Sequence, residues 1–167
     1  AITGAFQNAG QACTSVERLY VEDAIYDKFV DLLGKLGEKL VVSSGDGLNV
    51  HIGSMSNHTE FERTRAHIQD ALDQGARLIY GGNPRPELGP LFHEPTILAD
   101  CHHGMEIMRE ETFGPVLPVM RVENAMQAVH LANDSDYGLT ASIFSRDLHR
   151  AEDLARQINV GVVAINR

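Results

Sequence analysis

The sequence is poor in basic residues, with 14 Lys and Arg against 23 Asp and Glu among 167 residues, so its formal net charge is −9. A protein that follows the phosphates of a nucleic acid needs a basic stripe. No five consecutive residues here include more than two Lys or Arg. We therefore expect no nucleic-acid partner.

Cysteines and long apolar runs are scarce as well. The two cysteines, Cys13 and Cys101, do not form the disulfide framework of a small secreted protein, and no basic-then-apolar signal pattern opens the chain. Charged residues interrupt every apolar run before the ~18 residues that a membrane span needs. We expect a cytoplasmic protein that does not span a membrane.

The composition, 43% hydrophobic and 22% charged, is that of an ordinary globular protein, and the length suits one domain. Short runs of strand-forming residues alternate with segments of helical periodicity along the chain. Strands separated by helices pair in parallel, so the alternation predicts an α/β fold with a parallel sheet. Strands are expected at 18–22, 76–80, 95–98, 116–122, 141–144 and 160–165, and helices from residue 23, from residue 57, and at 123–132 and 148–158.

Two of these helices carry recognisable signals. The first has apolar residues at helical spacing, and we expect them to form its buried face, with Asp23 as the N-cap: Ile25, Phe29, Leu32, Leu33, Leu36 and Leu40. The second begins at Asn57, with a carboxylate three residues later at Glu60, and stops at Gly75.

Both ends of the chain lie in apolar segments that resemble core. Whole domains usually end in polar, fraying residues. We therefore expect this sequence to be an excised piece of a longer polypeptide.

Cys13 lies among small, polar and glycine residues, in the run QNAGQACTS at 7–15. Such neighbours leave room for a ligand to approach the sulfur, which suits a nucleophile; an inert side chain in a turn is the alternative. Cys101 precedes His102 and His103. Three adjacent residues of an extended backbone cannot all reach one metal ion, so we interpret Cys101 as a structural thiol and expect no metal site.

A second candidate site is the run REETFGP at 109–115. A carboxylate can accept hydrogen bonds from both hydroxyls of a ribose while an aromatic ring covers a flat heterocycle. A solvated acidic face is the alternative. Neither G-x-G-x-x-G nor G-x-x-x-x-G-K-[ST] occurs, so the chain does not hold a pyrophosphate by either device.

Four strings, in order, resemble motifs of the aldehyde dehydrogenase superfamily. FQNAGQAC at 6–13 is similar to its nucleophile loop and EETFGP at 110–115 to its nicotinamide-ribose motif, and EPTIL at 94–98 and NDSDYGLT at 133–140 also match. Within the superfamily, the chain most resembles lactaldehyde and glycolaldehyde dehydrogenases, through EETFGPVLPV at 110–119. The resemblance implies one domain over residues 1–167: part of a catalytic domain, a three-layer α/β sandwich with a mostly parallel sheet and helices on both faces.

The resemblance also implies roles for individual residues. Cys13 would be the nucleophile, Glu111 and Phe113 would contact the nicotinamide ribose and ring, and Ala12 and Thr14 would shape the acyl pocket. The cofactor would be NAD or NADP, with NAD favoured, and the substrate a small aldehyde of the lactaldehyde or glycolaldehyde kind that is oxidised to an acid. An isolated segment would expose faces that are meant to meet its partner domain, and oligomerisation is one way to cover them, so we expect a homo-oligomer.

The departures from the family pattern lead to alternatives. In the family, the cofactor domain, the general-base glutamate and an oxyanion asparagine precede the nucleophile loop, and this chain contains none of them. We therefore expect the isolated segment to be inactive. The alternatives are a non-catalytic truncated module that serves assembly or binding, and an ester hydrolase that uses Cys13 without a cofactor.

Overall fold

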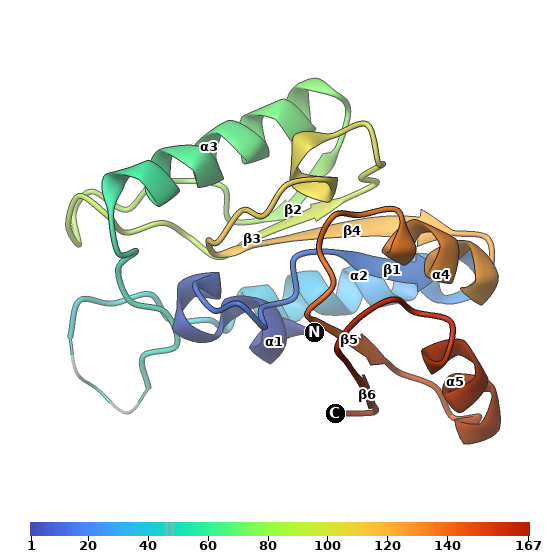
Figure 1. Ribbon diagram of the computed structural model, residues 1–167. Helices are drawn as coiled ribbons and strands as arrows, with labels where there is room; N and C mark the ends of the chain where they lie inside the picture. The colour runs from blue at the N-terminus through green and yellow to red at the C-terminus, as the bar shows by residue number, and fades with distance from the viewer. Residues whose placement is uncertain (46, 48) are drawn as a thin grey trace. The chain divides into compact units, whose positions relative to one another are not determined.

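The computed structural model describes residues 1–45, 47 and 49–167, which form two compact units, Ala1–Arg121 and Val122–Arg167 (Figure 1). None of the helices in these described ranges is long and apolar enough to cross a membrane. The elements are, in chain order, α1 (Ile2–Phe6), η1 (Gln7–Gly10), β1 (Leu19–Glu22), α2 (Asp23–Gly37), α3 (His58–Asp73), β2 (Arg77–Tyr80), β3 (Thr96–Ala99), η2 (Glu106–Met108), β4 (Val116–Val122), α4 (Ala125–Asn133), β5 (Thr140–Ile143), α5 (Leu148–Ala155) and β6 (Val162–Ile165).

The first unit is built on a four-stranded sheet in the order β1-β4-β3-β2. Strands β3 and β4 pair in parallel, with Ile97 opposite Leu117, as the sequence predicts. Strands β2 and β3 are antiparallel, which is compatible with the mostly parallel sheet that the resemblance implies. No helix lies between these two strands, and the chain turns back through the loop at 81–95.

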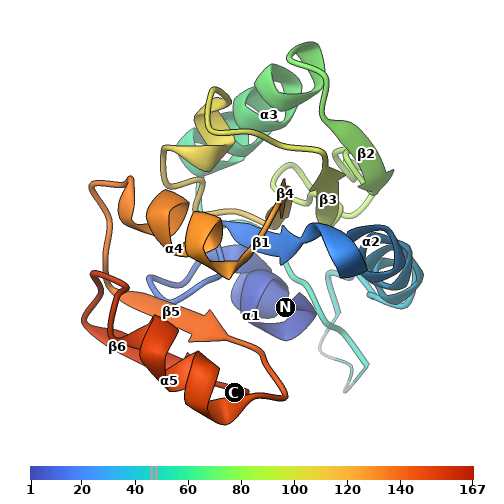
Figure 2. The ribbon, with the colours of Figure 1, turned by 90° about the vertical axis from the view of Figure 1, so that its right-hand side faces the viewer.

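Helices cover both faces of this sheet (Figure 2). Ile97 and Ala99 of β3 pack into one core with residues of α1 and α2, whereas Leu98, which points to the opposite face, packs into a second core with Ile68 and Ala71 of α3. This alternation is the two-residue period of a strand. The predicted α/β architecture, with helices on both faces of the sheet, is confirmed.

Helix α2 confirms only part of the expected buried face, because Leu33 is buried and Phe29 and Leu40 pack against the core. Its buried residues are Tyr26, Val30, Leu33 and Gly37, whereas Ile25, Leu32 and Leu36 are 56%, 54% and 37% exposed. The helix has apolar residues on more than one side. The sheet covers the side that carries Gly37, which lies so close to the ring of Tyr80 that an added Cβ atom would clash with it. The expected cap is also wrong: Glu22 is the N-cap position and Asp23 the first helical residue.

Helix α3 begins as the sequence predicts. Asn57 is its N-cap, and the side-chain oxygen of Asn57 accepts a hydrogen bond from the N–H of Glu60 at 2.9 Å. The helix ends before Gly75, whose φ of +97° favours glycine.

The second unit pairs β5 and β6 in parallel, with Thr140 opposite Val162. Helix α5 starts at the N-cap Asp147, whose side chain accepts a hydrogen bond from the N–H of Arg150. Asn133, in the NDSDYGLT string, bonds the backbone beyond α5 through both side-chain atoms, to the carbonyl of Gln157 at 2.7 Å and from the N–H of Asn159 at 2.8 Å. These two bonds therefore link the end of α4 to the segment between α5 and β6.

Candidate active site

The segment that leads to Cys13 has an unusual backbone. Three consecutive residues, Asn8, Ala9 and Gly10, have φ values of +54°, +56° and +72°. Residues other than glycine rarely adopt this region, and those that do cluster at functional sites. The side chain of Asn8 supports the turn by donating to the carbonyl of Gln11 at 2.9 Å. The Cys13 side chain that follows is exposed.

Before Cys13, the loop touches the EETFGP motif through two glycines. A Cβ atom added to Gly10 would lie 2.0 Å from the carbonyl oxygen of Gly114, so only a glycine fits. The two backbones are therefore in direct contact, three residues before Cys13.

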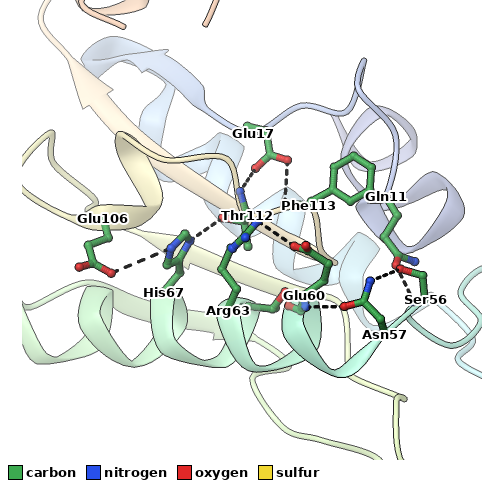
Figure 3. Close-up of polar contacts among 11 residues, drawn as sticks. Gln11, Glu17, Ser56, Asn57, Glu60, Arg63, His67, Glu106, Thr112 and Phe113 are labelled. Carbon is green, nitrogen blue, oxygen red and sulfur yellow. Dashed lines mark hydrogen bonds and ion pairs between the residues drawn. The ribbon is translucent and has the colours of Figure 1, made fainter. Parts of the chain in front are cut away.

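After Cys13, the same motif is contacted by a carboxylate. The two oxygens of Glu17 accept hydrogen bonds from the backbone N–H groups of Thr112, at 3.1 Å, and Phe113, at 3.2 Å (Figure 3). Cys13 is thus bracketed by two contacts to one turn, and the structure brings its loop beside the segment that carries Glu111 and Phe113.

Helix α3 supports the turn from the side opposite Glu17 (Figure 3). Nδ1 of His67 lies 3.0 Å from Oγ1 of Thr112, and a Cβ on Gly114 would lie 2.0 Å from Oγ1 of the buried Thr64. Just before this helix, the N–H of Ser56 donates to the side-chain oxygen of Gln11 at 2.7 Å. The loop, the turn and the start of α3 form one assembly.

Two ionisable groups in this assembly have shifted pKa values. Burial raises the pKa of Glu17 to about 7 against the lowering effect of its two N–H donors, and the negative charge of Glu111 adds to the rise. Burial also lowers the pKa of His67, although Glu106, 4.0 Å from Nε2, opposes this shift. The fold therefore buries His67 and partly buries Glu17 beside Thr112.

The expected site residues lie in this region with different accessibility. Cys13 and Thr14 are exposed, and Ala12, Glu111 and Phe113 are half-buried. Phe113 has a φ of +53°, so its backbone is strained like that of Ala9. An accessible thiol, a carboxylate and an aromatic ring are thus carried by two segments in contact.

Cys101 has the opposite character. Its side chain is 4% exposed, and burial raises the pKa of its thiol to about 12. Among the described residues, no group of three or more His, Cys, Asp or Glu side chains could hold a metal ion.

The sequence analysis missed the supporting residues Glu17, His67 and Gln11. Glu17 follows no spacing rule, because its partners lie about a hundred residues further along the chain. His67 is a single histidine in a helix, a pattern more typical of a structural residue. Only the tertiary contact with Thr112 distinguishes either residue.

The comparisons with known proteins agree with the geometry. The aldehyde dehydrogenase family model matches residues 1–167. The chain is 46% identical over 171 residues to 4,4'-diapolycopene aldehyde oxidase of Methylomonas sp, covering 99% of this chain and 30% of that protein. It is 38% identical over 161 residues to a putative succinate-semialdehyde dehydrogenase [NADP(+)] 2 of Mycobacterium ulcerans, covering 96% of this chain and 31% of that protein.

A solved structure, that of lactaldehyde dehydrogenase from Escherichia coli, matches with a TM-score of 0.93 at 37% identity, covering 99% of this chain and 35% of that one. The chain thus spans about a third of the length of the relatives that it matches.

Proposed function

Because the chain belongs to the aldehyde dehydrogenase family, we propose that it is the nucleophile-bearing part of the catalytic domain of an enzyme that oxidises a small aldehyde to a carboxylic acid with a nicotinamide cofactor. The supporting observation is the double contact that brackets Cys13. Gly10 and Glu17 both contact the turn at 112–114, which supports a site shared by the Cys13 loop and the segment that carries Glu111 and Phe113.

Cys13 supplies the nucleophile in this proposal. Its thiolate attacks the aldehyde carbon, a C–S bond forms, and the carbonyl oxygen becomes an oxyanion. The N–H of Cys13 itself can stabilise that charge. Loss of a hydride from the same carbon, which the bound cofactor would accept, leaves a thioester on Cys13. Attack by water, with release of one proton, then gives the acid and regenerates the thiolate.

Glu111 and Phe113 would hold the nicotinamide end of the cofactor. The half-buried carboxylate of Glu111 is suited to accept hydrogen bonds from ribose hydroxyls, and the half-buried ring of Phe113 to pack on a flat heterocycle. The cofactor, when bound, supplies the hydride acceptor. Ala12 and Thr14, on either side of Cys13, would border the substrate.

The general base, the oxyanion asparagine and the cofactor domain of the family lie outside these residues. We therefore expect no turnover from the 167 residues alone and propose that the activity belongs to a longer polypeptide. The relative from Mycobacterium ulcerans is named as NADP-dependent and as acting on succinate semialdehyde, and the solved Escherichia coli structure as a lactaldehyde dehydrogenase. Either NAD or NADP, and a small aldehyde of this kind, is consistent with the proposal.

A cytoplasmic homo-oligomer completes the proposal. On α2, the side chains of Ile25, Leu32 and Leu36 are exposed, and exposed apolar patches commonly mark interaction surfaces. Light scattering should show self-association of the chain, and a clean monomer at high concentration would contradict this part.

The main test is an assay of the longer polypeptide. Wild-type protein should form NADH or NADPH only when an aldehyde is added, and Cys13→Ser should lower the rate by about a thousandfold or more. Cys101→Ala, which removes the other thiol, is the matched control and should keep most of the rate. The proposal fails if no aldehyde-dependent signal appears, or if Cys13→Ser stays within about threefold of wild type.

A further inference from the structure

The hydrogen bonds of Glu17 suggest a role beyond packing. We propose that Glu17 is a positioning residue, which holds the backbone of Thr112 and Phe113 so that the side chains of Glu111 and Phe113 meet the cofactor beside the Cys13 loop. This inference rests on the proposed function, because it assigns Glu17 a part in that reaction.

The first argument is the geometry of the two bonds. Each oxygen of the carboxylate takes one donor, from two consecutive peptide groups. The N–H of Thr112 belongs to the peptide bond that follows Glu111, and the N–H of Phe113 to the next one. Fixing two successive peptide planes fixes the direction in which the side chains on either side leave the backbone.

The second argument is the strain that the bonds hold in place. Phe113 has a φ of +53°, a conformation that L-amino acids rarely adopt, and such residues persist only where their surroundings determine them. The N–H of Phe113 itself donates to Glu17. Without this acceptor, the turn is free to relax to a more common conformation, and the ring of Phe113 then moves.

The third argument is the choice of side chain. A carboxylate removed from water is costly unless it is paired and hydrogen-bonded, and both donors here are neutral backbone groups. Glutamine has the same shape but one acceptor oxygen instead of two, so it can accept from one donor in the same way and presents an NH₂ group to the other. Only an ionised carboxylate at position 17 accepts from both peptides in the same way, so the comparison below is made at pH 8, above the pKa of about 7.

The fourth argument is that Glu17 acts where other supports do not. His67 and Thr64 of α3 contact the Thr112 side chain and Gly114, but they bind neither of the N–H groups that Glu17 binds. The side chains of α3 therefore hold the body of the turn, whereas Glu17 sets the backbone next to Glu111 and Phe113.

The test compares three forms of the longer polypeptide: wild type, Glu17→Gln and the control Glu38→Gln, at an exposed position at the end of α2. We expect Glu17→Gln to raise the KM for the nicotinamide cofactor and lower kcat, with a combined loss in kcat/KM of about 10- to 100-fold, as expected from misplaced reacting groups. The alkylation rate of Cys13 by iodoacetamide without cofactor should stay within about twofold. The control should match wild type in all three measurements.

Amide hydrogen exchange adds a readout that does not depend on activity. The N–H groups of Thr112 and Phe113 should exchange about tenfold faster in Glu17→Gln than in wild type or Glu38→Gln. Unchanged exchange at both amides would overturn the inference. If the wild type is active, a Glu17→Gln variant that keeps the wild-type kcat and cofactor KM would also overturn it, as would a variant that loses only stability. A wild type without aldehyde-dependent activity would overturn the proposed function and the inference with it, which distinguishes the two failures.

Discussion

Replacing Glu17 with glutamine removes a partly buried carboxyl group whose charged form the fold disfavours. The pKa of this carboxyl rises from 4.5 to about 7 on folding. Between these two values the unfolded chain has released the proton while the folded chain still binds it, so the folded state loses stability as the pH rises. At about 1.4 kcal/mol per pKa unit, this group lowers the free energy of unfolding by roughly 2 to 3 kcal/mol between pH 5 and pH 8.

Glu17→Gln carries no titrating group at this position, so its stability relative to wild type should increase by that amount over the same range. Urea unfolding at pH 5, 6, 7 and 8 measures the difference, and because it is taken at each pH, the contributions of other titrating groups largely cancel. The chain has no Trp, so circular dichroism follows the transition. In a Cys13→Ser background, alkylation of the buried Cys101 reports the unfolding of the unit that contains position 17.

Glu38→Gln is the control for this measurement. A surface substitution of this kind should change stability by less than about 0.5 kcal/mol at every pH. The reasoning is refuted if the difference in free energy of unfolding between Glu17→Gln and wild type stays constant from pH 5 to pH 8. Such a result would mean that the carboxyl of Glu17 has the same pKa in the folded and the unfolded chain.

Three further predictions concern the thiols, the loop and α3. In native protein at pH 7.5, N-ethylmaleimide should modify the exposed Cys13 at least about a thousandfold faster than Cys101, whose thiol has a pKa of about 12; peptide mass spectrometry at timed intervals reads both rates, and comparable rates would contradict the burial. Gly10→Ala should lower the free energy of urea unfolding by about 3 kcal/mol or more, because its Cβ would lie 2.0 Å from the carbonyl oxygen of Gly114. The control Gly75→Ala should lower it by only about 1 to 2 kcal/mol, because Gly75 has a φ of +97° but open space around it. Asn57→Ala should cost about 1 kcal/mol in the same assay because it removes the cap of α3; no loss would mean that the cap contributes nothing.

Local signals were predictable from the sequence. The start of α3 followed from Asn57 and Glu60, because a cap depends on residues within one turn. The strand at Val116–Val122 followed from its apolar run.

The placement of the Cys13 loop beside the EETFGP motif followed from the family resemblance and not from spacing.

Features set by tertiary contacts were not predictable. On α2, apolar residues occur on more than one side, so periodicity alone cannot tell that the sheet covers Tyr26 and Val30 and leaves Leu32 exposed. The antiparallel pairing of β2 with β3 depends on where a loop returns the chain. Glu17 looks like any solvated carboxylate until the fold brings Thr112 and Phe113 to it.

The close approach of Gly10 and Gly114 has a consequence for biosynthesis. The two residues are separated by about a hundred positions, and a ribosome adds roughly 5 to 20 residues per second, so Cys13 emerges some 5 to 20 seconds before the turn that will face it. During this interval the thiol has no completed surroundings. The redox state of this nascent cysteine in that window therefore depends on the compartment around it and not on the protein.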